Sequence, residues 1–96
     1  MQERPFDCGV LVATASVNER MTNDQRFYHF ARFCLARHLN GDWGDLEKED
    51  RELNDEAVVS GERLHSAYIY KPTSEKLWII TEADRSVTTL LFPEDY

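Results

Sequence analysis

The chain has 96 residues, of which 42% are hydrophobic and 30% charged, so it can form one globular domain and is too apolar to be intrinsically disordered. Its net charge of −7 argues against a general nucleic-acid-binding protein, because contacts with phosphates need a net basic surface. No apolar run approaches the roughly 20 residues of a membrane span, and two cysteines are too few for a disulfide-rich secreted scaffold. We therefore expect a single cytoplasmic domain over residues 1–96, with reduced thiols and neither membrane nor direct nucleic-acid contacts.

The N-terminal third predicts a strand followed by an amphipathic helix. Val10, Leu11 and Val12 supply apolar and β-branched bulk to a strand over residues 9–17, and the nearly continuous apolar pattern predicts burial on both faces. Capping side chains at residues 22–24 then begin a helix that ends at Asn40-Gly41. Its apolar face, with spacings of three and four, consists of Phe27, Phe30, Ala31, Cys34, Leu35, His38 and Leu39. Its opposite face carries Arg26, His29, Arg32 and Arg37.

The middle of the chain is strongly acidic. Eight carboxylates against Lys48 and Arg51 leave residues 40–60 with a charge of −6. Residues 41–45 form a compact break, after which Asp45 is expected to cap a second helix that runs to about Val59. This helix has only a thin apolar face, so we expect it at the surface, as either a solvated helix or a negative docking surface.

The last third predicts three strands, at residues 63–71, 76–81 and 86–92, joined by turns at residues 72–75 and 82–85. Such short connections indicate an antiparallel meander. In the first of these strands, alternation places Tyr68 and Tyr70 on one face and Ala67 and Ile69 on the other. The sequence therefore predicts an α+β fold of order β-α-α-β-β-β, a small antiparallel sheet with two helices packed on one face.

Two segments carry side chains with functional potential. Asp42 and Asp45 flank Trp43 at a spacing that could hold a cation, but the rest of a calcium loop is missing, which favours a helix cap with an anchoring Trp. Glu82, Asp84 and Arg85 lie on a tight turn, where Asp84 is expected to bind backbone N–H groups and Arg85 to pair with Glu82. That turn also suits a partner surface or, less well, a catalytic site.

The histidines and cysteines give no strong signature. Cys34 and His38 are four residues apart on the first helix and would supply two of the four ligands of a zinc site, with Cys8 and His65 as the remaining pair, or a nucleophile and its base. Ordinary packing at the margin of the core is the favoured interpretation of these residues and of His29. We expect no metal, no cofactor and no catalytic residue.

Several stretches together form a family fingerprint. They are Ala36–Leu39, Gly41–Leu46, Glu49-Asp50, Asn54-Asp55, Arg63–Tyr68, Trp78–Thr89 and Leu90–Tyr96. With these motifs the chain resembles small bacterial proteins, often labelled "plasmid-related", that are carried on plasmids and integrative elements. The resemblance is close over residues 30–96 and loose over the first strand, and the loop at residues 71–76 is short and irregular here. It brings no enzymatic activity and implies interaction with the host or defence against host immunity.

The leading hypothesis is a non-catalytic protein-binding accessory protein of a mobile element, with an acidic surface that binds a basic host protein and inhibits a host defence. The expected partner-binding residues are Asp42, Trp43, Asp45, Glu49, Asp50, Asp55, Glu82, Asp84 and Arg85. One alternative is a small-molecule-binding or enzymatic domain at the Gly41–Asp45 loop and the Glu82–Arg85 turn. Another is a homodimeric accessory protein that associates through an exposed strand edge or through the face of Tyr68 and Tyr70.

Overall fold

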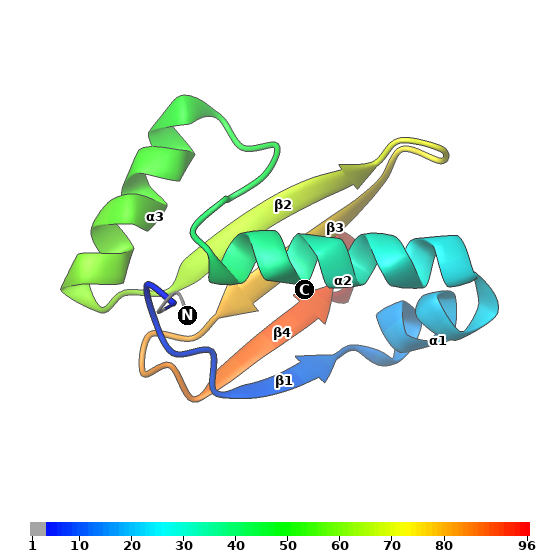
Figure 1. The fold of residues 1–96 in the computed structure, drawn as a ribbon, viewed down its shortest axis with the longest axis horizontal. Helices are drawn as coiled ribbons and strands as arrows, with labels where there is room; N and C mark the ends of the chain where they lie inside the picture. The colour runs from blue at the N-terminus through cyan, green and yellow to red at the C-terminus, as the bar shows by residue number, and fades with distance from the viewer. Residues whose placement is uncertain (1–3) are drawn as a thin grey trace.

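The computed structural model describes residues 4–96 and confirms an α+β fold with a small open sheet (Figure 1). Within these residues, no helix is long and apolar enough to cross a membrane. The elements are β1 (Val10–Ala13), α1 (Ala15–Asn23), α2 (Gln25–Leu39), α3 (Lys48–Ser60), β2 (Leu64–Tyr70), β3 (Glu75–Thr81), β4 (Val87–Leu91) and a closing 3-10 turn (Pro93–Asp95).

The four strands have the spatial order β1-β4-β3-β2. The predicted meander is confirmed, because β2 pairs antiparallel with β3 and β3 with β4. β1 joins the sheet beside β4 and runs parallel to it, with Val10 opposite Val87. β1 and β2 are therefore the two edge strands (Figure 1).

The expected long first strand is wrong in its second half, which forms the additional helix α1. Thr14 ends the strand and becomes the N-cap of α1, where its side chain accepts a hydrogen bond from the Val17 N–H. The hydroxyls of Thr14 and Ser16 also donate to Asp95, at 2.8 and 2.6 Å, and so fix the start of α1 to the closing turn. Capping chemistry thus overrides the apolar run.

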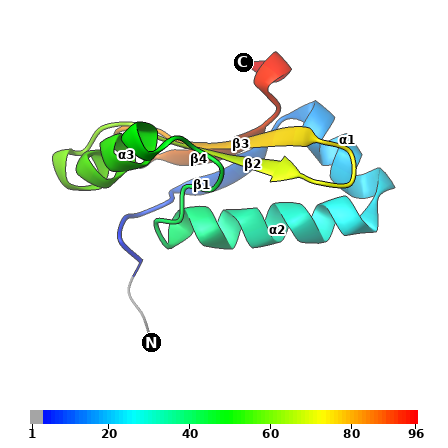
Figure 2. The same ribbon diagram turned by 90° about the horizontal axis from the view of Figure 1, so that it is seen from above.

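The core lies between α2 and one face of the sheet (Figure 2). Phe27, Ala31 and Cys34 of α2 are fully buried, and Tyr68 and Tyr70 pack in the same cluster. These two tyrosines are therefore unavailable as a dimer interface, contrary to one of the expectations from sequence. The closing turn lies on the opposite face of the sheet (Figure 2).

The acidic helix α3 lies at the β2 side of the sheet, away from the face that α2 covers (Figures 1 and 2). Asn54 and Ala57 are its only buried residues, which agrees with the predicted thin apolar face. Glu47, not Asp45, occupies its N-cap position, and Gly61 ends the helix in a left-handed conformation. A second, smaller core joins α3 to the end of α2 through Phe6, Leu39, Trp43, Ala57 and Leu64.

Candidate functional site

The Gly41–Asp45 loop is held by its own side chains. The Asp42 carboxylate accepts from the Arg37 guanidinium at 2.8 and 3.1 Å, and this pair lowers the pKa of Asp42. Trp43 is only 3% exposed and donates its indole N–H to Asp55 at 2.8 Å. Three of the expected partner-binding residues, Asp42, Trp43 and Asp55, therefore serve the fold at this loop.

The same loop covers the outer edge of β2. The Asp45 N–H donates to the Ala67 carbonyl at 2.7 Å, and the Asp45 carboxylate accepts from the Ile69 N–H at 2.9 Å. This second bond is why Asp45 does not cap α3. In the second turn of α3, the side-chain amide of Asn54 bonds both the N–H and the C=O of His65, at 3.0 and 2.9 Å, as a neighbouring strand would. We call this paired side of β2 the covered edge.

The Glu82–Arg85 turn holds the far end of α3. Asp84 accepts from the Ser86 N–H at 3.0 Å, which confirms the expected turn chemistry. Arg85 adopts a positive φ of 60° and donates to the carbonyls of Ala57 and Glu62, at 2.9 and 2.6 Å. It thereby ties the turn to the C-terminal end of α3, where the Ala57 carbonyl also accepts from the Gly61 N–H at 2.9 Å.

The expected pairing of the Glu82 and Arg85 side chains is wrong. Of Glu82, Arg85 contacts the backbone carbonyl, at 3.2 Å, and the Glu82 carboxylate instead lies 3.4 Å from Arg63. Phe6 lies between the two segments of the enzymatic alternative, the Gly41–Asp45 loop and the Glu82–Arg85 turn. Its ring stacks on that of Trp43 with the centroids 6.0 Å apart, and the Arg85 guanidinium lies 5.8 Å from the centre of the Phe6 ring. The pockets that border the two segments, one lined by Arg85 and the other by Asp42, are separate.

A chain of buried hydrogen bonds connects α2 to the sheet. His38 contacts Ser66 through Nδ1 at 2.6 Å and Thr81 through Nε2 at 2.8 Å. Thr81 contacts the Thr88 hydroxyl, which donates to the Cys8 carbonyl at 2.7 Å. Because that last bond fixes the direction, Thr81 donates to Thr88 and accepts from the Nε2–H of His38, and Nδ1 accepts from Ser66. Burial lowers the pKa of His38 to about 3, so the imidazole is neutral at pH 7.

This network accounts for His38 as a core residue. Cys34 is also buried, and its burial raises the pKa of the thiol to about 12, which removes the thiolate that a nucleophile or a metal ligand needs. Cys8 and Cys34 are both free thiols, and His29 is exposed on α2. Among residues 4–96, no group of three or more His, Cys, Asp or Glu side chains is placed to hold a metal ion.

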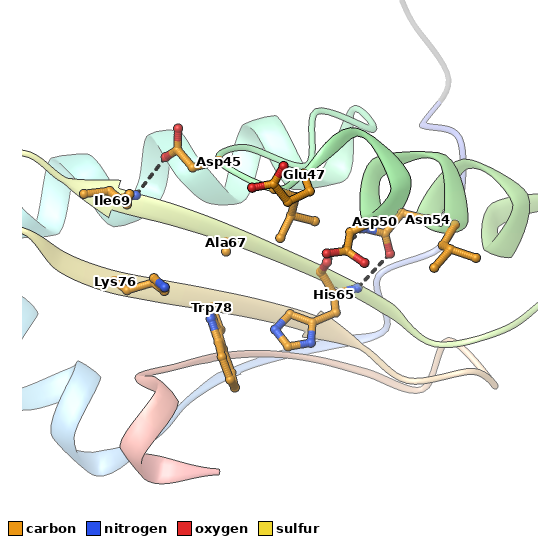
Figure 3. Close-up of a pocket in the computed structure, with 11 residues that line it drawn as sticks. Asp45, Glu47, Asp50, Asn54, His65, Ala67, Ile69, Lys76 and Trp78 are labelled. Atoms are coloured by element: carbon orange, nitrogen blue, oxygen red, sulfur yellow. Dashed lines mark hydrogen bonds between the residues drawn. The ribbon is translucent and has the colours of Figure 1, made fainter.

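A groove of about 550 Å³ lies where the start of α3 meets the sheet face that α2 leaves uncovered (Figure 3). Its floor is formed by Ala67 and Ile69 of β2 with Lys76 and Trp78 of β3. Ile69 is 40% exposed although it is fully apolar. On the floor, the ring of His65 meets that of Trp78 edge to face at 4.5 Å. Apart from Lys76, the floor is therefore apolar and aromatic.

The rim of the groove is acidic. Asp45 and Glu47 border it from the loop and Asp50 from the first turn of α3, whereas Lys76 is the one cation among its lining residues (Figure 3). Burial, followed by the charge of Arg63, lowers the pKa of His65, so this side chain adds no positive charge at pH 7. The groove is thus net negative at neutral pH. Glu49 is exposed on α3 without lining it.

Sequence reasoning found part of this rim and none of the floor. Asp45 and Asp50 were expected binding residues, whereas Ile69, Lys76 and Trp78 were not. The available signal was indirect, because the predicted sheet, with its helices on one face, leaves the other face open. In the structure α2 covers the first of these faces, whereas α3 lies at the β2 side. Alternation along β2 then places Ile69 on the open face, opposite to Tyr68.

Comparison with known proteins finds no match for this chain among family models, curated proteins or solved structures. The resemblance to plasmid-related proteins stays a prediction.

Proposed function

We propose that the protein is a non-catalytic binding module that holds a basic segment of a partner protein in the groove between α3 and the β2–β3 face. One observation carries this proposal: an apolar, aromatic floor lies directly beside an acidic rim. Together with the resemblance, it favours a basic host protein as the partner and inhibition of a host defence as the role.

A lysine or arginine side chain matches this arrangement. Such a side chain combines an apolar stem with a cationic head and commonly places the stem along an apolar surface. Here the stem would lie along Ile69 and Trp78, and the head would reach Glu47 or Asp50. The half-exposed indole of Trp78 adds a surface on which a cation is attracted to the ring. Charge would govern encounter and specificity, and the apolar floor would supply contact area.

The helix also keeps its carboxylates available. Glu47, Glu49 and Asp50 are exposed and form no ion pair in the described structure, whereas Asp42 and Asp55 are bound within the fold. Carboxylates near the first turn of a helix are favoured by its dipole, so this charge is compatible with a stable α3. Of the acidic residues predicted from sequence to bind a partner, those near the N-terminus of α3 thus remain available for binding.

The test compares two substitutions that change charge equally on one helix. Asp50→Lys alters the rim, and Glu56→Lys alters an exposed position of α3 outside the groove. A partner is first captured from nuclease-treated bacterial lysate at low and high salt, and its affinity for each purified variant is then measured by calorimetry. We expect Asp50→Lys to weaken binding by at least about tenfold and Glu56→Lys by less than about threefold.

The apolar floor is tested separately with Ile69→Ser, which should weaken binding with no change in its salt dependence. A fluorescein-labelled octalysine peptide serves as a probe for the charge of the rim alone. Equal losses with Asp50→Lys and Glu56→Lys, or binding that is indifferent to salt, would show that the groove is not the binding site.

A further inference from the structure

The outer side of β1 is the second edge of the sheet, and its backbone has no partner there among residues 4–96. The N–H groups of Val10 and Thr14 donate to carbonyls of Ser86 and Leu90, each at 3.0 Å. Successive residues of a strand direct their backbone groups to alternate sides. The N–H and C=O groups of Leu11 therefore face away from β4, as do those of its neighbour Ala13. We call this side of β1 the open edge.

The side chains at the open edge are apolar and exposed. Val10, Leu11 and Val12 are 65%, 47% and 41% exposed. Beside them, a shallow apolar groove of about 210 Å³ runs between β1 and α2, bordered by Leu11, Tyr28 and Leu35 among others. Exposed edge strands usually carry lysine, proline or a bulge that prevents pairing with another chain. The open edge has none of these, since residues 9–18 contain no charged side chain and no proline.

The charge distribution of the chain allows a second copy to approach the open edge. The chain carries a net charge of −7, so two copies repel each other over most approaches. The acidic helix α3 lies beside β2, at the opposite side of the sheet from β1 (Figure 1). A copy that approaches β1 therefore meets an uncharged strand and keeps the two acidic helices at the far ends of the assembly. Arg32 is the one charged residue that borders the neighbouring groove.

We infer that a second copy of this chain pairs with the open edge, antiparallel and across a two-fold axis perpendicular to the sheet. Leu11 of each copy then exchanges backbone hydrogen bonds with Ala13 of the other, and the two Val12 residues lie at the axis, which satisfies the outward groups of both strands. The two four-stranded sheets become one continuous sheet. Both α2 helices lie on the same face, and each Leu11 side chain lies beside the apolar groove of the other copy. The groove beside α3 stays free in this dimer.

The experiment measures molar mass by light scattering at protein concentrations that differ by about a hundredfold. We expect the wild-type mass to rise from one chain to two as concentration increases. Leu11→Lys should weaken self-association by at least about tenfold, because it places a charge next to the centre of the pairing. Ile69→Lys is the matched control, since Ile69 is similarly exposed but lies at the other side of the sheet. It should leave the dimer intact while it weakens partner binding, so the two proposals fail independently.

Amide hydrogen exchange supplies a readout that non-specific association would not produce. At high concentration the amides of Leu11 and Ala13 should exchange more slowly, whereas that of Val12, which faces β4, should be unaffected. Circular dichroism confirms that Leu11→Lys is folded, as its exposed position predicts. A wild-type protein that stays a monomer at both concentrations, as it would if an extended segment of another protein occupied this edge, overturns the inference. So does a Leu11→Lys variant that dimerises normally, or an equal change at Leu11 and Val12.

Discussion

The two edges of the sheet differ in how their backbone is satisfied. At the covered edge, Asn54 and Asp45 supply side-chain partners to β2, and the Asp45 N–H adds a main-chain bond to Ala67. At the open edge, Leu11 and Ala13 direct backbone groups outward among exposed apolar side chains. The chain thus protects the edge beside its acidic helix and leaves the uncharged edge available for pairing.

The covered edge also positions the proposed binding groove. Asn54 fixes α3 against β2, and Asp45 fixes the loop that precedes α3 against the same strand. Asp50, one turn before Asn54, is thereby placed above the apolar floor. The residues that protect β2 thus also hold the acidic rim in place.

The largest expected effect is that of Asn54→Leu, which breaks the covered edge. The substitution leaves the N–H and C=O of His65 without partners in a half-buried position. We expect it to lower the free energy of unfolding by about 2–4 kcal/mol, measured by urea denaturation.

The matched control for this prediction lies on the open edge. Val12→Asn introduces a polar side chain at an exposed position, and we expect a loss of less than about 1 kcal/mol. Equal losses for the two variants would mean that Asn54 does not stabilise β2 through its backbone.

An intermediate effect is expected when the pH is lowered. The buried imidazole of His38 contacts Ser66 of β2, the strand of the covered edge, whereas residues 9–18, which include the open edge, carry no ionisable side chain. The pKa of His38 is about 3 in the folded protein and about 6.5 when unfolded. Between these pH values only the unfolded state binds the proton. The stability that the neutral His38 contributes is therefore fully present above pH 6.5. It is lost as the pH falls toward 3, by up to about 1.4 kcal/mol per pH unit.

The pH dependence is measured by urea denaturation at pH values between 7 and 5, where most carboxylates stay ionised. His65, whose pKa is also lowered, contributes with the same sign. His38→Gln keeps hydrogen-bonding capacity and removes the titration, so its stability should depend less on pH than that of the wild type. An unchanged slope in this variant would contradict a neutral, buried His38.

The smallest effect is expected for Asp45→Ala. Asp45 is exposed, so water can replace its carboxylate at the Ile69 N–H. We expect a loss of about 0.5–1 kcal/mol in thermal denaturation, together with faster hydrogen exchange at the Ile69 amide. Glu47→Ala, which removes a nearby carboxylate that makes no such bond, should leave that amide unchanged. If both variants speed its exchange equally, the effect is electrostatic and not due to the hydrogen bond.

The sequence predicted best the elements whose signals are local. α2 has a clear apolar face, the Asp24 cap and Gly41 at its end, and the meander has turn residues between its strands. α1 was missed because Val17 is its only fully buried residue, so no apolar face marks it. The role of Asp45 was missed because its partner, the Ile69 N–H, lies far along the chain.

The sequence indicated only the acidic half of the candidate site, for a similar reason. Acidic residues such as Asp50 can be recognised in any sequence by their charge. The apolar floor of Ile69 and Trp78 becomes a site only because α2 covers one face of the sheet and leaves the other exposed. That choice depends on tertiary packing, which a residue pattern indicates only weakly.

The parallel pairing of β1 with β4 has a consequence for folding kinetics. β2, β3 and β4 are neighbours in sequence, so their hairpins close short loops. Val10 meets Val87 only after nearly the whole chain between them has been arranged. The entropy of closing that long loop must be overcome before β1 gains any contact with β4, and such non-local pairing slows folding. We therefore expect β1, with its apolar edge, to join the sheet after the hairpins have formed.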